Sequence, residues 1–170
     1  MKMFSLDVIR RENLRFLSER ELISEDAFFV LEYFSKISKA SVVPENLYFY
    51  YKRAGSLTKS YRADRQHRNN LFLQKALEYV DGQKLPGQIK NHITARYHMY
   101  TIAALKHITH SQLSAEGKKE AIQAVFRDSV LRSTLENKVL KLHKSSLRLF
   151  FSFLKIKAYP ICKLLLSLKG

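Results

Sequence analysis

The chain has 170 residues, 46% hydrophobic and 12% aromatic, so it is long and apolar enough to bury a core and is not a disordered polypeptide. Its single cysteine, Cys162, excludes an internal disulfide or a cysteine-rich zinc site and fits a reducing compartment such as the cytoplasm. The formal net charge of +15 indicates an anionic partner: phospholipid, nucleic acid or a phosphorylated substrate.

The positive charge is concentrated in the second part of the chain. Residues 1–58 carry a net charge of +1, and residues 59–170 carry +14. This division predicts two functional regions, of which the second meets the anionic partner. The longest apolar stretch, Leu147 to Ala158, is interrupted by three basic residues, so it is too short and too polar to span a bilayer.

The first third of the sequence predicts helices and a small strand pair. A short helix is expected over residues 6–17, and a second helix with apolar periodicity follows Ser24, whose hydroxyl is suited to cap it. Small and β-branched residues predict a strand at Lys39–Val43. Alternating aromatic residues predict another at Leu47–Tyr51, followed by a loop that contains Gly55.

Only helices are expected beyond residue 60. One should end at Asp81-Gly82, another should follow Pro86-Gly87, and a third should begin near Ser114. The capping-box spacing of Ser133–Glu136 predicts a long final helix that Pro160 ends or kinks. The predicted fold is therefore mostly α with a small β element.

Several motifs in residues 6–58 occur together in one protein family. They are Arg10–Phe16, Ser24-Glu25-Asp26-Ala27-Phe28-Phe29, Val42-Val43-Pro44, the aromatic Leu47–Tyr51, and Gly55-Ser56-Leu57-Thr58. In this order they resemble the C-terminal half of the catalytic domain of bacterial family 2 glycosyltransferases. Those are inverting GT-A enzymes of polysaccharide and cell-envelope glycan synthesis. The resemblance covers about a third of the chain and implies transfer of a sugar from a nucleotide-sugar donor to a glycan or lipid-linked acceptor.

The resemblance also implies roles for individual residues. Asp26 would be the general base that deprotonates the acceptor hydroxyl, with Glu25 in support. The expected contacts to the donor diphosphate come from cationic and hydroxyl side chains, namely Lys52, Arg53, Ser56 and Thr58. The alternative is structural, because acidic residues are common in the first turn of helices and Arg53 also suits a solvated turn.

The chain departs from the family where donor binding is concerned. It contains no Asp-x-Asp motif for a divalent metal, and no parallel βαβ run for the nucleotide. We therefore expect a partial GT-A domain at 1–60 and a helical basic extension at 61–170, in a truncated, split or degenerate enzyme with little catalysis of its own. Mg²⁺ or Mn²⁺ is expected only in the intact enzyme. His107 and His110 have no acidic or cysteine neighbour in sequence, so we predict no metal site in this chain and no cofactor.

The tail at 137–170 combines eight Lys/Arg residues and no acid with many Phe and Leu residues. This composition is typical of segments that lie in the interface of an anionic bilayer, so we predict a peripheral protein on the cytoplasmic face of the cell membrane. Alternatively, the apolar face packs on the rest of the domain. Nucleic-acid binding is a rival for the charge, but it is not favoured because no helix-turn-helix, zinc or RNA-binding strand pattern accompanies it.

Overall fold

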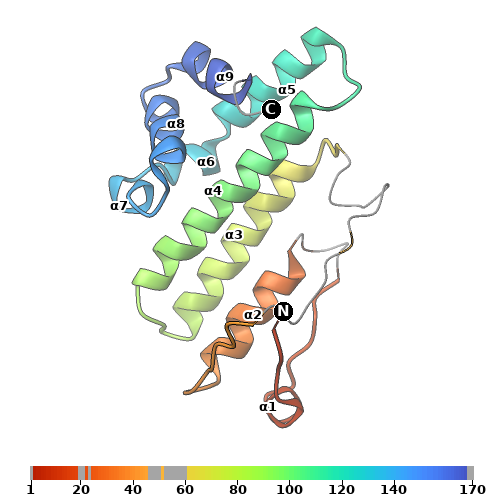
Figure 1. The fold of residues 1–170 in the computed structure, drawn as a ribbon, viewed down its shortest axis with the longest axis vertical. Coiled ribbons are helices and arrows are strands. Elements are labelled where there is room, and N and C mark those ends of the chain that lie inside the picture. Colours follow the sequence, from red (N-terminus) through yellow and green to blue (C-terminus); the bar gives the residue numbers. More distant parts are fainter. Residues whose placement is uncertain (1, 19–21, 23, 46–50, 52–60, 168–170) are drawn as a thin grey trace. The chain divides into compact units, whose positions relative to one another are not determined.

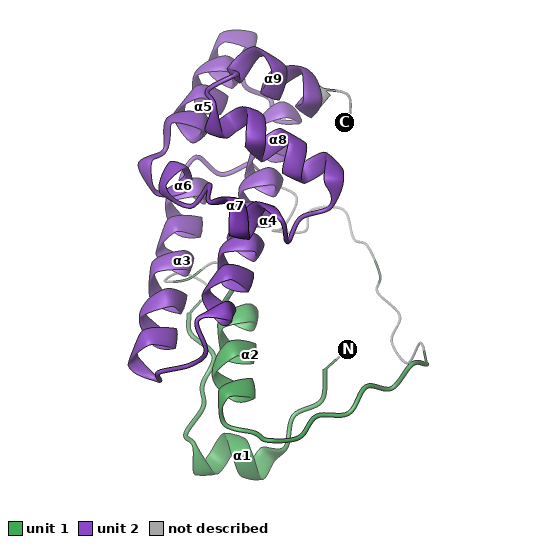
Figure 2. Ribbon diagram, turned by 90° about the vertical axis from the view of Figure 1, so that its left-hand side faces the viewer, with its two compact units in different colours: residues 1–58 green, residues 59–170 purple. Residues whose placement is uncertain are grey.

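The computed structural model describes residues 2–18, 22, 24–45, 51 and 61–167, and all regular secondary structure among them is helical (Figure 1). The prediction of a mostly α-helical protein is therefore confirmed. The chain divides into two compact units, Met1–Thr58 (unit 1) and Lys59–Gly170 (unit 2) (Figure 2). The functions predicted for the two parts stay predictions.

The described part of unit 1 holds two helices, α1 (Leu6–Arg11) and α2 (Glu25–Ser35). The helix predicted over 6–17 is shorter because Asn13 adopts a left-handed conformation with φ 49°. The amide of Leu14 then donates to the carbonyl of Ile9 (2.9 Å), which closes the helix end and turns Leu14 inward. Leu14 joins two residues of α2 in a small core, to which four partly buried residues add: Phe4, Val8, Ile9 and Ile37.

The strand predicted at Lys39–Val43 is wrong. These residues are described and adopt no regular secondary structure, and the Val42 side chain is 93% exposed. β-branched residues favour extended backbone, but a strand also needs a neighbour to pair with, and none exists among the described residues. Most of the second predicted strand, at 47–50, lies outside the described residues, while Tyr51 is exposed and has no regular structure.

Unit 2 is built on two long neighbouring helices, α3 (Arg65–Gly82) and α4 (Gln88–Thr109), which run antiparallel (Figures 1 and 2). Both lie where the sequence predicted helices. The left-handed residue between them is Lys84 (φ 51°), not Gly82, and Leu85 donates to the carbonyl of Val80 (3.0 Å). Next comes α5 (Ala115–Arg127), which begins where predicted, because the Ser114 hydroxyl accepts a bond from the amide of Gly117 (3.1 Å).

The long helix predicted after Ser133–Glu136 is replaced by short ones. They are α6 (Ser129–Ser133), α7 (Asn137–Leu140), α8 (Ser145–Lys155) and α9 (Tyr159–Ser167). The predicted capping box fails because Thr134 ends α6 and its hydroxyl donates to the Leu131 carbonyl (2.6 Å). Lys157 (φ 62°) separates the last two helices, and Pro160 lies in the first turn of α9, where proline is tolerated.

The core of unit 2 draws on all seven of its described helices. Its fully buried large side chains include Tyr97, Leu105, Phe126, Leu131, Phe151 and Leu154. Helices α5, α8 and α9 lie near one end of the α3–α4 pair in both views (Figures 1 and 2). Cys162 is buried there, and burial raises the pKa of its thiol to about 11, so the cysteine is a packing residue rather than a nucleophile.

Candidate functional site

The two carboxylates singled out by the sequence lie in the first turn of α2. Glu25 is half-buried, and Asp26 is exposed. The predicted capping by the Ser24 side chain is wrong. Ser24 has a left-handed backbone (φ 65°) instead of the extended one of most capping residues, and its hydroxyl makes no capping hydrogen bond. Its carbonyl still accepts from the amides of Ala27 and Phe28, at 3.0 and 3.2 Å, and so begins the helix.

The opposite face of α2 anchors these carboxylates. Phe29 and Tyr33 are buried, and the Tyr33 hydroxyl accepts a hydrogen bond from the amide of Ser5 (2.8 Å). Phe4 meets the Phe29 ring edge-on, with 5.3 Å between centroids. These contacts orient α2 so that Asp26 faces solvent, where it makes no hydrogen bond or ion pair with the residues that the structure describes. A carboxylate in this setting can accept a proton from a bound hydroxyl.

The structure does not describe the other residues of the predicted site. Lys52, Arg53, Ser56 and Thr58 lie outside the described residues, so their contacts to a diphosphate stay predictions. Within unit 1 the structure therefore places the predicted base and its neighbour only.

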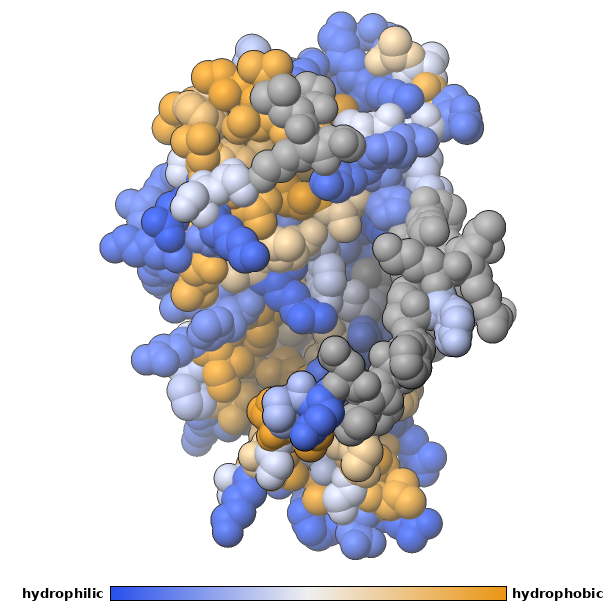
Figure 3. Space-filling view, viewed as in Figure 1, coloured by the Kyte–Doolittle hydropathy of each residue, from blue (hydrophilic) through white to orange (hydrophobic). Residues whose placement is uncertain are grey.

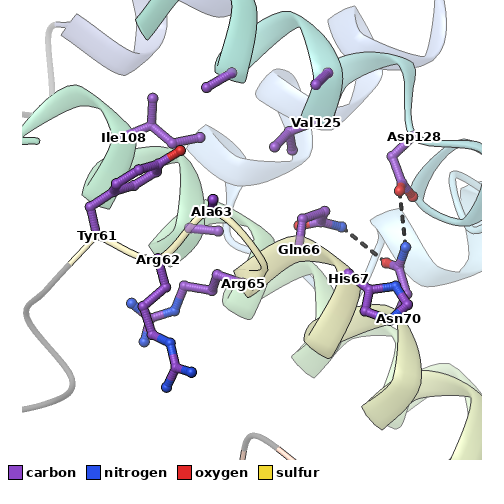
Figure 4. Close-up of a pocket in the computed structure, with 13 residues that line it drawn as sticks. Tyr61, Arg62, Ala63, Arg65, Gln66, His67, Asn70, Ile108, Val125 and Asp128 are labelled. Carbon is purple, nitrogen blue, oxygen red and sulfur yellow. Dashed lines mark hydrogen bonds between the residues drawn. The ribbon is translucent and has the colours of Figure 1, made fainter. Parts of the chain in front are cut away.

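A pocket of about 290 Å³ lies in unit 2, at the beginning of α3 (Figure 4). Helices α4 and α5 line it with apolar and mostly small side chains, and Tyr61 contributes an aromatic ring. The apolar lining consists of Tyr61, Ala63, Ala104, Ile108, Ala121, Ala124 and Val125. Because alanines stand where helices usually interdigitate larger side chains, the helices leave room for a small molecule.

One wall of this pocket is polar and held rigidly. Gln66 donates to the side-chain oxygen of Asn70 (3.1 Å), a bond drawn in Figure 4. The Tyr97 hydroxyl donates to the same oxygen (2.7 Å). The Asn70 amide donates to Asp128 (2.9 Å), whose other oxygen accepts from the amide of Leu131 (2.8 Å). The network ties α3 to α4 and to the beginning of α6. Burial raises the pKa of Tyr97, and the nearby negative charge of Asp128 adds a smaller increase, so the Tyr97 hydroxyl stays protonated.

The rim of the pocket is cationic. Arg62 and Arg65 both line it, and Figure 4 shows their side chains directed to the same side. Asp64 is shared between Arg62 (3.4 Å) and Arg68 (2.6 Å), and the bond from Arg68 holds the pKa of this carboxyl below its usual value. Partial burial, followed by repulsion from Arg62, lowers the pKa of Arg65.

A buried histidine pair in unit 2 was not anticipated. The hydroxyl hydrogen of Thr134 goes to the Leu131 carbonyl, so Nε2 of His98 must donate to Thr134 Oγ1 (2.8 Å). Nδ1 of His98 then accepts from Nε2 of His143 (2.9 Å), and the Phe151 ring stacks on His98 at 4.5 Å. Burial, then the charge of the neighbouring histidine, lowers the pKa of His98 to about 3. The pair is neutral and shielded from solvent, which suits a structural role.

Comparison with protein-family models, with curated proteins and with solved structures found no match. No group of three or more His, Cys, Asp or Glu residues that could hold a metal ion occurs in the described part of the chain. The sequence also contains no Asp-x-Asp motif.

The pocket residues were missed because the sequence gives only part of their signal. Arg62, Arg65 and Arg68 stand close together at the beginning of a helix, which is visible in the sequence, but such clusters usually cover a solvated helix end. The alanines opposite come from residues 104–124 and meet them only through the packing of α4 on α3 and of α5 on α4. His67 is exposed and also lines the pocket.

Proposed function

We propose that unit 1 is the acceptor side of an inverting GT-A glycosyltransferase, with Asp26 as the general base. The observation that carries this proposal is the orientation of α2, whose aromatic face is buried while Asp26 stands exposed in its first turn. The same pattern of acid pair, aromatic pair and basic Gly-Ser-Leu-Thr turn supports it in the sequence.

In this mechanism Asp26 accepts the proton of the acceptor hydroxyl while the oxygen of that hydroxyl forms a bond to the anomeric carbon of the sugar. The bond from that carbon to the nucleoside diphosphate breaks on the opposite face, which inverts the configuration. Glu25 helps to orient the acceptor. Lys52, Arg53, Ser56 and Thr58 would stabilise the negative charge of the departing diphosphate by charge-assisted hydrogen bonds.

Donor binding belongs, in this proposal, to residues outside this sequence, because no Asp-x-Asp motif is present. Exposed apolar residues support the view that unit 1 is part of a larger catalytic domain. Phe16, Phe34 and Val43 are 60%, 48% and 59% exposed. The divalent cation and the nucleotide-sugar would then be held by that other segment.

The test joins this chain to the segment encoded immediately upstream and measures release of nucleoside diphosphate with a panel of nucleotide-sugars. Asp26→Asn is expected to reduce transfer by about 10²–10⁴-fold while nucleotide binding is preserved, because a general base contributes about that factor. Asp7→Asn is the matched control, since Asp7 is an exposed acid in the first turn of α1 in the same unit. If Asp26→Asn retains transfer, Asp26 is not the general base. If the unsubstituted fusion shows no transfer, the glycosyltransferase proposal is wrong.

A second candidate function, binding to an anionic membrane surface, is favoured by the exposed side chains of the last helices. Leu149, Ile156 and Leu164 are 49%, 70% and 58% exposed. Figure 3 shows hydrophobic side chains gathered over α8 and α9. Around them stand basic residues, and no acid occurs between residues 137 and 167; the cations are Lys138, Lys141, Lys144, Arg148, Lys155, Lys157 and Lys163. None of the described helices is long and apolar enough to cross a membrane.

This arrangement suits a helix pair that lies on the cytoplasmic leaflet. Each basic residue near an anionic surface contributes roughly 1 kcal/mol, and the exposed leucine and isoleucine side chains add burial of apolar area. Co-sedimentation with vesicles of phosphatidylcholine alone and of phosphatidylcholine with phosphatidylserine tests it. The double variant Ile156→Ser/Leu164→Ser should lose binding, whereas Leu71→Ser, a partly exposed leucine of α3, should not. Salt-sensitive binding to DNA or RNA without vesicle binding would reject the membrane in favour of nucleic acid.

A further inference from the structure

Two hollows of unit 2 share one lining residue, Leu166 of α9. The basic hollow, of about 380 Å³, is lined by the end of α4, the beginning of α5 and α9, and its lining contains His110, Lys118, Lys119 and Lys163. The apolar groove, of about 80 Å³, is lined by α4, α8 and α9. We infer that together they bind one anionic phospholipid, with a phosphomonoester headgroup in the basic hollow and the beginning of an acyl chain in the apolar groove.

This inference deepens the second candidate function and rests on it, because a bilayer must present the lipid to the protein. It is independent of the acceptor-side proposal, since all residues of the two hollows belong to unit 2. Leu164, which is 58% exposed, belongs to the same turn of α9 as Lys163. A helix that meets the bilayer through Leu164 would bring both hollows to the level of the lipid headgroups.

Two lysines of the basic hollow have no anionic partner. Lys119 pairs with Glu116 (3.1 Å), but Lys118 and Lys163 are half-buried and make no ion pair or side-chain hydrogen bond with any residue that the structure describes. No acid among the described residues lines either hollow. Because a partly desolvated ammonium group is costly without a counter-charge, the two lysines favour an anionic ligand that enters between α5 and α9.

A histidine adds a further group to the basic hollow. Nδ1 of His110 donates to the carbonyl of Lys106 (2.7 Å), because a carbonyl oxygen only accepts. Nε2 makes no hydrogen bond with the residues that the structure describes, so it can donate to an anion when the ring is protonated. A phosphomonoester carries up to two negative charges and three strong acceptor oxygens, which matches two lysines and this ring better than a singly charged carboxylate does.

The apolar groove specifies the other part of the ligand. Most of its lining is hydrocarbon, contributed by Ile102, Leu147, Leu149, Phe150, Leu165 and Leu166. Its polar side chains are those of Lys106 and Ser146, both exposed. A sugar or a nucleotide base would find few hydrogen-bonding partners there, whereas an acyl chain gains burial of apolar area. The small volume holds only the beginning of a chain, and the remainder stays in the bilayer.

The test is co-sedimentation of the full chain with two kinds of phosphatidylcholine vesicle, which contain either phosphatidic acid or phosphatidylserine at matched surface charge. Binding should be at least about tenfold tighter with phosphatidic acid, because only this lipid carries a phosphomonoester. Lys118→Gln/Lys163→Gln should abolish that preference. Lys141→Gln/Lys144→Gln is the matched control, because it removes the same charge from exposed positions outside both hollows, and it should keep the preference.

Soluble probes separate the headgroup from the chain. In calorimetry, dioctanoyl phosphatidic acid should bind at least about tenfold more tightly than glycerol phosphate. Ser146→Phe fills the apolar groove from an exposed position and keeps every lysine, so it should reduce the affinity for the lipid to near that for glycerol phosphate. If this variant does not fold, as judged by circular dichroism, Leu149→Ser removes a 49% exposed part of the groove lining and should act in the same direction.

The outcomes distinguish this site from membrane binding in general. Vesicle binding without a preference for phosphatidic acid, or a preference that Lys118→Gln/Lys163→Gln retains, would overturn the inference and leave the membrane candidate in place. Equal affinity for dioctanoyl phosphatidic acid and glycerol phosphate would indicate a site for free phosphate esters and would also overturn it. If the chain binds neither kind of vesicle, the membrane candidate is wrong and the inference falls with it.

Discussion

The two units bury their apolar side chains to very different degrees. In unit 2 Tyr97, Phe126 and Phe151 are fully buried, and the core continues through every described helix of the unit. In unit 1 the Phe16 ring stacks on Phe29 at 4.2 Å but remains 60% exposed. Unit 2 therefore closes a core of its own, whereas the described part of unit 1 offers an aromatic surface suited to a further covering layer.

Removing a central ring from unit 2 should give the largest loss of stability. Phe151→Ala should lower the free energy of unfolding by about 3–5 kcal/mol, because the ring is fully buried and stacks on His98. Urea unfolding followed by circular dichroism measures it. Leu149→Ala on the same helix is the control, since this side chain is 49% exposed and its loss should cost much less. Equal losses in the two variants would contradict a closed core in unit 2.

Acidification should destabilise unit 2, because the buried His98–His143 pair lies in this unit. Burial lowers the pKa of both residues, that of His98 to about 3, and the charge of Arg148 adds to the effect on His143. The unfolded chain binds these protons below pH 6.5 and the folded chain does not, so stability is complete above that pH and falls as pH decreases. The expected slope is about 1.4 kcal/mol per pH unit for each histidine held neutral.

Urea unfolding of unit 2 at several pH values between 7 and 5 measures this slope. His143→Gln should be less stable at pH 7 and show a shallower pH dependence, because one titrating group is removed from the pair. His92→Gln is the matched control, since His92 is exposed on α4, and it should keep the slope of the unsubstituted chain. A stability that does not change between these pH values would show that the pair is charged or solvated in the folded protein.

The helix caps give the smallest expected difference between the units. Ser114→Ala should cost about 1 kcal/mol, because the Ser114 hydroxyl accepts from the amide of Gly117 and begins α5. Ser24→Ala should cost little in unit 1, because the Ser24 side chain makes no capping bond. Hydrogen exchange of the first-turn amides of α5 and α2 measures both effects locally. Comparable losses in the two helices would mean that Ser24 caps α2 in solution.

Several helix ends could not be predicted because their signals are weak. Asn13, Lys84 and Lys157 each take a left-handed conformation at or just beyond a helix end, a position where glycine is the usual residue. Asn13 was readable in principle, because asparagine tolerates this conformation. The lysines were not, since lysine has no such preference and the turn is closed by hydrogen bonds from the amides of Leu85 and Ala158 to carbonyls of the preceding helix. Thr134 similarly ends a helix rather than beginning one, because its hydroxyl bonds to the preceding turn.

The candidate site in unit 1 was more predictable than the one in unit 2. Glu25 and Asp26 could be placed at a helix start because the acids, the aromatic pair and the helical period are consecutive in sequence. The pocket in unit 2 combines residues from 61 to 128, and sequence spacing carries no information about which faces of α3, α4 and α5 meet.

By itself the sequence determined the helical character of the chain, the starts of α2, α4 and α5, and the acidic first turn of α2. These are local properties, set by periodicity and by residues within a few positions of one another. Tertiary structure alone decided the absence of a strand at 39–43, the short helices after Asp128, the neutral His98–His143 pair and the arginine-rimmed pocket. Each of these depends on partners distant in the chain, whose packing outweighs local preference.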